Sequence, residues 1–389
     1  MHATAESVPV KTPWGTVFSI GLAMFVLIAS EFMPVPLLTP IARDLSMSEG
    51  QVGQAVSFSG LFAVLTSLFG GSLLARLDRR VVLLAFTVIV VGSSISMAMA
   101  EDPLSFLLAR ALIGMSIGGY ISLTTSVIAR TVRPDDLTRA LAVLQSGTAL
   151  AAVVAQPAGS LIGSVAGWRG AFVALVLPGL VALVWQALVL PKLPPEGRGA
   201  SVRENIRLLG NRTYLTGMGA MMLFFVAQFA LSTYLRPYLE TITGLDVSTL
   251  SLFLLAIGLS GLAGTTLVPG FLEAHLRAML IGLPAVLGVV AILLVVFGTS
   301  AWVALLLLII WGLLTTPMPT AWTMWMTTVI PDKLEAGGAM LVALIQLAIT
   351  GGAFGGGVLF DGLGWWTAFV FAGLAFFGAG LVALRTSPH

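Results

Sequence analysis

The chain is a succession of apolar runs of about 20 residues, the length that a helix needs to cross the hydrocarbon core of a bilayer. The runs lack the alternating ten-residue pattern of an outer-membrane barrel. With 58% hydrophobic and 9% charged residues, the chain is also more apolar than a soluble domain. It contains no Cys, which excludes disulfides and thiolate metal sites. We therefore expect an all-α integral membrane protein.

Twelve transmembrane helices are expected from these runs. The stretch before Trp14 lacks the basic start and short apolar core of a signal peptide, so the first helix is expected to be retained. The expected helices cover approximately residues 14–38, 51–75, 81–100, 103–128, 140–165, 167–190, 213–238, 248–272, 276–297, 301–329, 334–360 and 364–384.

The distribution of Lys and Arg predicts the orientation. If the N-terminus is cytoplasmic, the inner side carries fifteen basic residues and the outer side three, namely Arg43, Arg169 and Arg236. Such an excess follows the positive-inside rule. We expect a multi-pass protein of the bacterial inner membrane with both termini cytoplasmic. The formal net charge of +2 is explained by this topology and gives no indication of a nucleic-acid partner.

The chain divides into two similar halves. The longest hydrophilic stretch predicts an N-terminal six-helix bundle over residues 1–190, a cytoplasmic linker over 191–212 and a C-terminal six-helix bundle over 213–389. A shift of 197 positions aligns short segments of the halves, as expected for an internally repeated transporter. The aligned segments are Glu31-Phe32 with Gln228-Phe229, Gly159 with Gly356, and Gly167-Trp168 with Gly364-Trp365.

Glu31 is an acid in an otherwise uncharged run from Trp14 to Ile41. A charge at the centre of a bilayer is expensive, so an ionisable residue there predicts a functional site. Its counterpart in the second half is the amide Gln228, which means that only the first half can take up a proton at this position. Counted from the helix ends at 1.5 Å per residue, Glu31 and Arg110 each lie about 10 Å below the outer surface.

Several motifs resemble the major facilitator superfamily. They are the basic loop Gly71 through Arg80, the run Arg110-x-x-x-Gly114-x-x-x-Gly118, and Pro157-x-Gly159-x-x-x-Gly163, which is similar to the antiporter motif of the drug/proton antiporter branch. The resemblance covers the whole chain. It implies two pseudo-symmetric six-helix bundles around a central cavity that the first and fourth helices both face. A Glu31–Arg110 pair is allowed there, either for proton coupling or as a static ion pair that holds the helices together.

The basic loop departs from the family pattern at two positions. Ala75 stands where the family usually has Asp, and Asp78 stands where it usually has Gly. The resemblance implies a cytoplasmic gating loop formed by Arg76, Asp78, Arg79 and Arg80.

A closer likeness is to bacterial purine ribonucleoside efflux pumps. The segments that carry it include Glu31 through Pro40, Gln228-Phe229-Ala230, Tyr234-x-Arg236-Pro237 and Gln346-Leu347-Ala348. The likeness implies proton-coupled export of inosine and guanosine by alternating access. Sugar or multidrug efflux antiporters share much of the pattern, and a passive facilitator in which Glu31 is structural is a further alternative.

Amides and aromatic side chains are the candidate ligands for a substrate inside the membrane. Glutamines present both donors and acceptors, although each could instead bond a neighbouring helix. Trp311 lies near mid-span and needs a partner for its indole N–H. Trp322 and Trp325 are expected at the membrane interface, and Pro317 and Pro319 should break their helix. The candidate substrate-binding residues are Gln145, Gln156, Gln228, Gln346, Phe224, Phe225, Trp311, Tyr234 and Arg236, the last two with gating or anchoring as alternatives.

No catalytic or metal site is indicated. His2, His275 and His389 are isolated, and the glycines between Gly351 and Gly357 are typical of close helix packing rather than of a phosphate loop. No nucleophile, base and orienting acid converge, so we expect no enzyme and no cofactor. The expected partners are a small-molecule substrate, protons and the lipid bilayer, with a monomeric protein and no nucleic acid.

Overall fold

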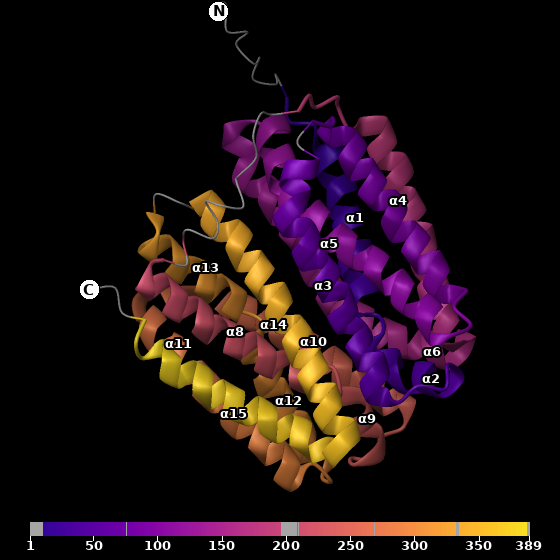
Figure 1. Cartoon of the computed structure of the whole chain (residues 1–389), viewed down its shortest axis with the longest axis vertical. Coiled ribbons are helices and arrows are strands. Elements are labelled where there is room, and N and C mark those ends of the chain that lie inside the picture. The colour runs from indigo at the N-terminus through magenta and orange to yellow at the C-terminus, as the bar shows by residue number, and fades with distance from the viewer. Residues whose placement is uncertain are drawn as a thin grey trace, which may run out of the picture.

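The computed structural model describes residues 11–74, 76–195, 208, 210–267, 269–331 and 334–386, and the regular elements in these ranges are helices. Two groups of helices lie side by side, and each is continuous in sequence (Figure 1). The first group consists of α1 (Trp14–Phe32), η1 (Val35–Leu37), α2 (Leu38–Asp44), α3 (Glu49–Leu73), α4 (Arg79–Ala98), α5 (Pro103–Thr131), η2 (Pro134–Asp136) and α6 (Leu137–Val189).

The second group follows the linker region. It consists of α8 (Arg212–Ser232), α9 (Leu235–Thr241), α10 (Val247–Leu267), α11 (Pro269–Phe297), α12 (Ala301–Thr315), α13 (Met318–Val329), α14 (Leu334–Leu363) and α15 (Trp365–Ala383). Each group has a hydrophobic core of its own, and Tyr234 of the second group packs in the core of the first.

Twelve membrane crossings follow from the helix lengths. Among the described residues, eleven segments are long and apolar enough to cross a membrane. One of them contains α6, whose 53 residues would extend about 80 Å as a single helix, more than twice the hydrocarbon thickness. The helix is interrupted at Gly167 and therefore makes two crossings. The predicted all-α membrane fold with twelve transmembrane helices is confirmed.

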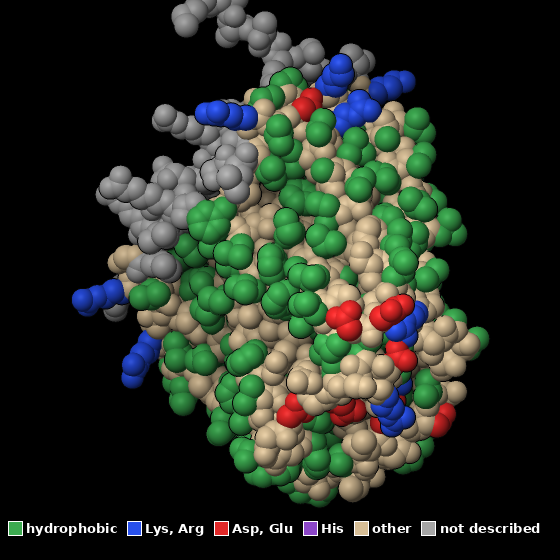
Figure 2. Space-filling view, turned by 45° about the vertical axis from the view of Figure 1, so that its right-hand side comes forward, with side chains coloured by type: hydrophobic (Ala, Val, Ile, Leu, Met, Phe, Trp, Pro, Cys, Tyr) green, Lys and Arg blue, Asp and Glu red, His purple; other side chains and the backbone are tan. Residues whose placement is uncertain are grey.

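Uncharged side chains form a broad hydrophobic band between two charged ends of the molecule (Figure 2). We call the end that contains Thr12, Asp78 and Leu193 the terminal face, and the end that contains Ser48 and Asp361 the distal face. The short helices α2 and α9 lie at the distal face, away from the N-terminus (Figure 1). A band of this kind is what a bilayer requires of the surface that contacts lipid.

Prolines interrupt two of the expected helices. The prediction of one helix over residues 14–38 is wrong at its end, because α1 stops at Phe32 and the chain resumes as η1 and α2. Pro34 has no N–H, so the carbonyl of Ser30 cannot receive the usual helical hydrogen bond. The predicted break at Pro317 and Pro319 is confirmed, since α12 ends at Thr315 and α13 begins at Met318.

The 197-residue repeat is visible in backbone angles. Gly167 and Gly364, which are 197 positions apart, have φ values of +73° and +99°. Residues with a Cβ rarely adopt such angles, so both turns require glycine. Each glycine is followed by a tryptophan that meets a phenylalanine edge to face, Trp168 on Phe172 at 6.1 Å and Trp365 on Phe369 at 6.0 Å.

Packing around two other glycines repeats at the same offset. A Cβ on Gly159 would meet Met33 and Pro36, and a Cβ on Gly356 would meet Ala230 and Tyr234. These glycines allow the end of the first helix of each group, or the residues that follow it, to approach a later helix of the same group closely. The same spacing in sequence therefore produces the same contact in both groups.

The two groups meet mainly along α3 with α14 and α6 with α10, and α9 also contacts α2 and η1. Among the described residues, the hydrogen bonds between the groups join the distal half of α3 and the residues before it to the second group. Asp361 of α14 accepts from the amide of Gly50 at 3.0 Å and from the hydroxyl of Ser48. Ser57 donates to the carbonyl of Thr350 at 2.8 Å. These contacts hold the groups together at the distal face.

Candidate functional site

Glu31 and Arg110 form a buried ion pair. A guanidinium nitrogen of Arg110 lies 2.9 Å from a carboxylate oxygen of Glu31. The side chain of Arg110 is fully buried and that of Glu31 is 10% exposed. The predicted contact between the two residues is therefore present, and it joins α1 to α5.

Ser59 of α3 completes a three-residue network. Its hydroxyl lies 2.9 Å from the second carboxylate oxygen of Glu31, to which it donates, and 2.9 Å from Arg110, from which it accepts. Arg110 also donates to the carbonyl of Ser30 at 3.2 Å, the acceptor left free by Pro34, and to the carbonyl of Ala55 at 3.4 Å. The network thus links α1, α3 and α5, and its charged groups are hydrogen-bonded, as buried charges must be.

Glycines in α5 bring this network together. A Cβ at Gly114 would overlap the carbonyl oxygen of Ser59, and a Cβ at Gly118 would overlap that of Ala63. Because these positions lack side chains, the backbone of α5 lies directly on α3. Arg110 is one turn from Gly114 on the same face and therefore reaches Ser59 and Ala55.

The residues that follow the two aligned polar positions meet between the helix groups. Phe32 and Phe229 stack at a centroid distance of 6.5 Å with an interplanar angle of 17°. They follow Glu31 and Gln228 directly. The amide oxygen of Gln228 is buried without a hydrogen-bond partner among the described residues. The acid of one group and the amide of the other therefore flank one aromatic contact.

The sequence comparisons assign the family. The model for the Major Facilitator Superfamily matches residues 20–340, which is most of the chain. The chain belongs to the Major Facilitator Superfamily. It is therefore a membrane transporter rather than an enzyme.

Two proteins similar to this chain have different names. The chain is 42% identical over 359 residues to the transcription regulatory protein OpdE of Pseudomonas aeruginosa, covering 92% of this chain and 89% of the relative. It is 36% identical over 352 residues to the purine ribonucleoside efflux pump NepI of Salmonella typhimurium, covering 90% of this chain and 88% of the relative. The resemblance to purine ribonucleoside efflux pumps is thereby confirmed.

Solved superfamily structures share the fold at low sequence identity. A bacterial homologue of the human lysosomal transporter Spinster, in an inward-facing and unoccupied conformation, superposes with a TM-score of 0.75 at 16% identity, covering 99% of this chain and 96% of the other. The human organic anion transporter MFSD10 gives 0.69 at 19% identity, covering 96% and 100%. At this level of identity the likeness shows the fold alone.

The predicted amides lie in different surroundings. Gln346 of α14 is buried, and its side chain has no hydrogen-bond partner among the described residues. Gln156 is half-buried and Gln145 is exposed, both on α6. In the second group, Gln346 is thus buried and Gln228 is partly buried.

Trp311 is buried on α12, and its indole N–H has no partner in the described part of the chain. The described residues do not supply the partner that this indole needs. A buried donor without a partner is costly, so it is a candidate to bind a ligand. The expected interfacial position of Trp322 and Trp325 is wrong, since both are buried in the core of the second group and meet edge to face at 5.7 Å.

Two of the predicted aromatic ligands lie in a core instead. Phe224 is fully buried, and it packs edge to face on Phe225 at 5.5 Å and on Phe376 of α15 at 5.3 Å. Because Phe224 is enclosed by other rings, it supports α8 rather than presenting a surface to substrate. Phe225 belongs to the same core.

Tyr234 and Arg236 lie at the distal contact between the groups. The hydroxyl of Tyr234 donates to the carbonyl of Ala353 at 2.8 Å, and its ring stacks on Phe360 at 5.1 Å. A Cβ on Gly53 of α3 would overlap this ring, so Tyr234 fills the space between α3 and α14. Arg236 pairs with Glu240 at 2.7 Å and keeps one buried nitrogen unpartnered among the described residues.

Asp78 binds the start of the linker. Its carboxylate accepts from the amide of Arg80 at 2.8 Å, which caps α4, and from the amide of Leu193 at 3.1 Å. Arg79 donates from its backbone to the carbonyl of Leu193 at 2.9 Å. Arg80 reaches the carbonyl of Ala187 at 2.6 Å, and Arg76 is exposed. The four predicted loop residues thus lie at the terminal face, and Ala75 lies outside the described residues.

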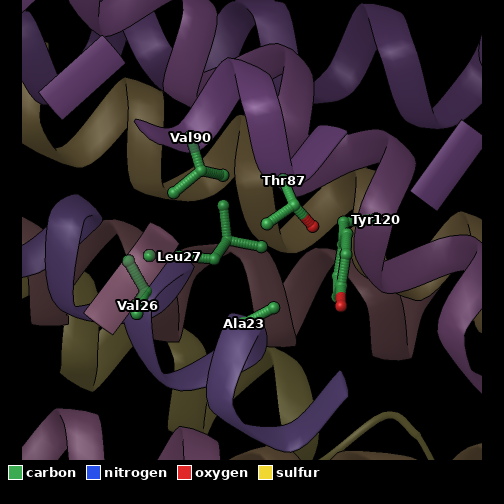
Figure 3. Close-up of a pocket in the computed structure, with 7 residues that line it drawn as sticks. Ala23, Val26, Leu27, Thr87, Val90 and Tyr120 are labelled. Carbon is green, nitrogen blue, oxygen red and sulfur yellow. The ribbon is translucent and has the colours of Figure 1, made fainter. Parts of the chain in front are cut away.

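Ser59 and Gln186 are polar residues that the sequence did not single out. Gln186 donates to the hydroxyl of Tyr120 at 2.8 Å and accepts from Thr87 at 2.9 Å. Figure 3 shows Tyr120 and Thr87 beside a void among Ala23, Leu27 and their neighbours, which has no room for a water molecule. The side chains of Gln186, Tyr120 and Thr87 have hydrogen-bond partners and are enclosed, which indicates a structural role for them.

Proposed function

We propose that this transporter is a proton-coupled antiporter that exports purine ribonucleosides such as inosine and guanosine. The observation that carries the proposal is the buried Glu31–Arg110 pair, in which a protonatable acid is held beside the contact of the two helix groups. The substrate class is supported by the similarity to a purine ribonucleoside efflux pump. The membrane is the bacterial inner membrane, with both termini cytoplasmic.

Protonation of Glu31 would change the packing of three helices. It removes the negative charge beside Arg110, and an uncompensated buried charge costs about 3–5 kcal/mol. The other acceptors of Arg110 are the carbonyl of Ser30 on α1 and Ser59 and the carbonyl of Ala55 on α3. The negative charge on Glu31 therefore favours the arrangement of α1, α3 and α5 seen in this structure, and loss of that charge would favour a different arrangement.

Substrate recognition falls mainly to the second group. Gln228 offers a buried acceptor and Trp311 a buried donor, neither of which has a partner among the described residues. A purine carries donors and acceptors along its edge and stacks through its face. Phe32 and Phe229 supply rings between the groups, and Gln346 supplies a further amide.

The direction of transport follows from the orientation proposed. With the terminal face cytoplasmic, the contacts of Ser48 and Tyr234 close the periplasmic side. Substrate enters from the cytoplasm while Glu31 is deprotonated. Proton entry from the periplasm then favours release, as alternating access about a central site requires.

Proton coupling is tested by Glu31→Gln in proteoliposomes with an imposed pH gradient. We expect the variant to lose uphill guanosine accumulation while guanosine exchange at equal pH remains. Asp44→Asn is the matched control, because Asp44 pairs with Arg169 at the surface. Uphill accumulation by Glu31→Gln at the wild-type level would show that Glu31 is structural, as in a passive facilitator.

The substrate is tested separately by thermal shift of the purified protein with nucleosides, sugars and lipophilic drugs. Stabilisation by guanosine and inosine supports the nucleoside assignment, because a ligand that binds the native state raises its stability. Stabilisation by drugs or sugars alone would assign the protein to the runner-up classes.

A regulatory role is a second candidate, favoured by the 42% identical relative that is named as a transcription regulatory protein. In this view the protein affects transcription through a bound solute rather than by moving it. Gene expression measured with wild-type protein and with Glu31→Gln distinguishes the two. A transcriptional response that persists without transport would favour regulation.

A further inference from the structure

A groove of about 540 Å³ lies at the distal end of the contact between the two helix groups. Its walls are α3, the start of α5, and α14, and residues 46 and 47 close one end. The hydrogen bond from Ser57 to the carbonyl of Thr350 lies in its wall and joins α3 to α14 at 2.8 Å. A groove of this volume is large enough for part of a lipid or for a small molecule.

The groove opens toward the bilayer. Leu104 and Leu108 on α5, Phe354 and Val358 on α14, and Leu61 on α3 are exposed large hydrophobic residues at or beside it. Exposed apolar residues on transmembrane helices contact lipid chains. The molecules next to this groove are therefore membrane lipids.

Polar side chains line the groove near the distal face. They are Ser46, Gln51 and Gln54, whereas Leu61, Leu107 and Phe354 supply an apolar part. Gln54 has no hydrogen-bond partner among the described residues, and Gln51 uses its amide oxygen to cap the backbone of Ser48 at 2.8 Å. Glutamines beside lipid are unfavourable unless a polar group meets them. The lining thus suits an amphiphile with a polar head and an apolar chain.

The charges near the groove indicate which kind of lipid head group it would bind. Its described lining residues include no Lys or Arg. Asp102 directly precedes the lining residue Pro103, and Asp361 accepts from Ser48, the residue that Gln51 caps. The hydrogen bond from the amide of Ser105 lowers the pKa of Asp102, so this carboxylate is ionised at neutral pH. Two carboxylates beside the polar part favour a cationic head and disfavour an anionic one.

We propose that this groove binds a phospholipid with a primary ammonium head group. The ammonium donates to Gln54 and approaches Asp361 and Asp102, and an acyl chain lies along Leu61, Leu107 and Phe354. Since the groove is formed by both helix groups, the bound lipid stabilises the arrangement in which the distal face is closed. The inference is independent of the transported substrate and of proton coupling.

Native mass spectrometry of the purified protein with equal amounts of phosphatidylethanolamine, phosphatidylcholine and phosphatidylglycerol tests the proposal. We expect phosphatidylethanolamine to be retained most and phosphatidylglycerol least. Gln54→Leu should reduce phosphatidylethanolamine retention about fivefold, the effect of one lost hydrogen bond. Thr266→Leu, at an exposed position on α10, is the control and should have no effect. Equal retention of the three lipids by wild type and Gln54→Leu would overturn the proposal.

Carbodiimide coupling locates the lipid without any variant. The reagent joins the lipid amine to a carboxylate as an amide, with loss of water to the carbodiimide. In nanodiscs of phosphatidylethanolamine we expect lipid adducts on Asp102 or Asp361, and in nanodiscs of phosphatidylcholine we expect none. Adducts confined to other carboxylates would place the lipid elsewhere and reject this groove.

Discussion

The two helix groups repeat the same contacts but differ in charge. Gly167 and Gly364 adopt the same unusual backbone conformation, and their tryptophans make the same edge-to-face contact. At the position of Glu31 the second group has Gln228, and at that of Arg110 it has Leu307, which is buried. The second group thus has uncharged residues at both positions that form the buried ion pair in the first. The repeat determines where the helices lie, and in the proposed mechanism the substitutions determine which group responds to a proton.

The largest expected effect comes from making the first group resemble the second. Arg110→Leu leaves Glu31 buried without its cation and should destabilise the protein by about 3–5 kcal/mol. The double variant Glu31→Gln, Arg110→Leu has the neutral pair of the second group and should recover most of this loss. Thermal unfolding in one detergent measures both. If the double variant is no more stable than Arg110→Leu, the halves differ in more than charge.

The next effect tests the equivalence of the two turns. Gly167→Ala and Gly364→Ala should each destabilise by about 1–3 kcal/mol, because both backbones combine a positive φ with an extended ψ, a region adopted almost only by glycine. Neither added methyl has a steric clash, since a Cβ on Gly364 would lie 3.6 Å from the nearest atoms, those of Trp366, and a Cβ on Gly167 would meet none within 4 Å.

Two helical glycines provide matched controls for these turns. Gly92 on α4 and Gly219 on α8 have open space for a Cβ. Gly92→Ala and Gly219→Ala should be neutral or slightly stabilising, because alanine favours a helix. A large difference between the two turn variants in thermal unfolding would contradict the equivalence of the groups.

Gln228→Leu tests the proposal that the second group binds substrate while the first group carries proton coupling. If Gln228 binds the purine as proposed, removing its unpartnered amide should weaken guanosine binding about tenfold, as expected for a hydrogen bond worth about 1–1.5 kcal/mol. The pH dependence of transport should remain, because Glu31 and Arg110 are unchanged. Equilibrium binding and gradient-driven uptake measure the two properties. Loss of pH dependence in Gln228→Leu would show that the second group takes part in coupling.

The smallest effect concerns the contact between the groups. Asp361→Asn weakens the hydrogen bonds to Ser48 and Gly50 and should favour opening of the distal face by about 0.5–1 kcal/mol, because the contact is exposed. The chain has no Cys, so a single cysteine at Phe32 reports access from that side through its rate of alkylation. Asp246→Asn, an exposed helix-capping position before α10, is the control. An unchanged alkylation rate would show that Asp361 does not hold the face closed.

Part of the candidate site can be predicted from depth together with the family resemblance. Counting residues from the helix ends places Glu31 and Arg110 at the same depth, the resemblance implies that their helices face one cavity, and their contact is present at 2.9 Å. Ser59 could not be predicted, since one serine among many gives no signal until Gly114 brings α5 against α3. The sequence predicts the wrong position for Trp322, because tryptophan near a helix end suits both the membrane interface and a buried core, where the structure places it.

The sequence by itself determined the membrane setting, the twelve crossings and the repeat. These properties are local, because a bilayer requires each segment to satisfy its own backbone and to be apolar along its length. Only the tertiary structure decided which face of each helix meets another helix and which meets lipid, since both environments are apolar and select similar side chains. The network of Glu31, Arg110 and Ser59 and the groove between α3, α5 and α14 therefore emerge only from packing, because each joins residues from helices that close glycine contacts bring together.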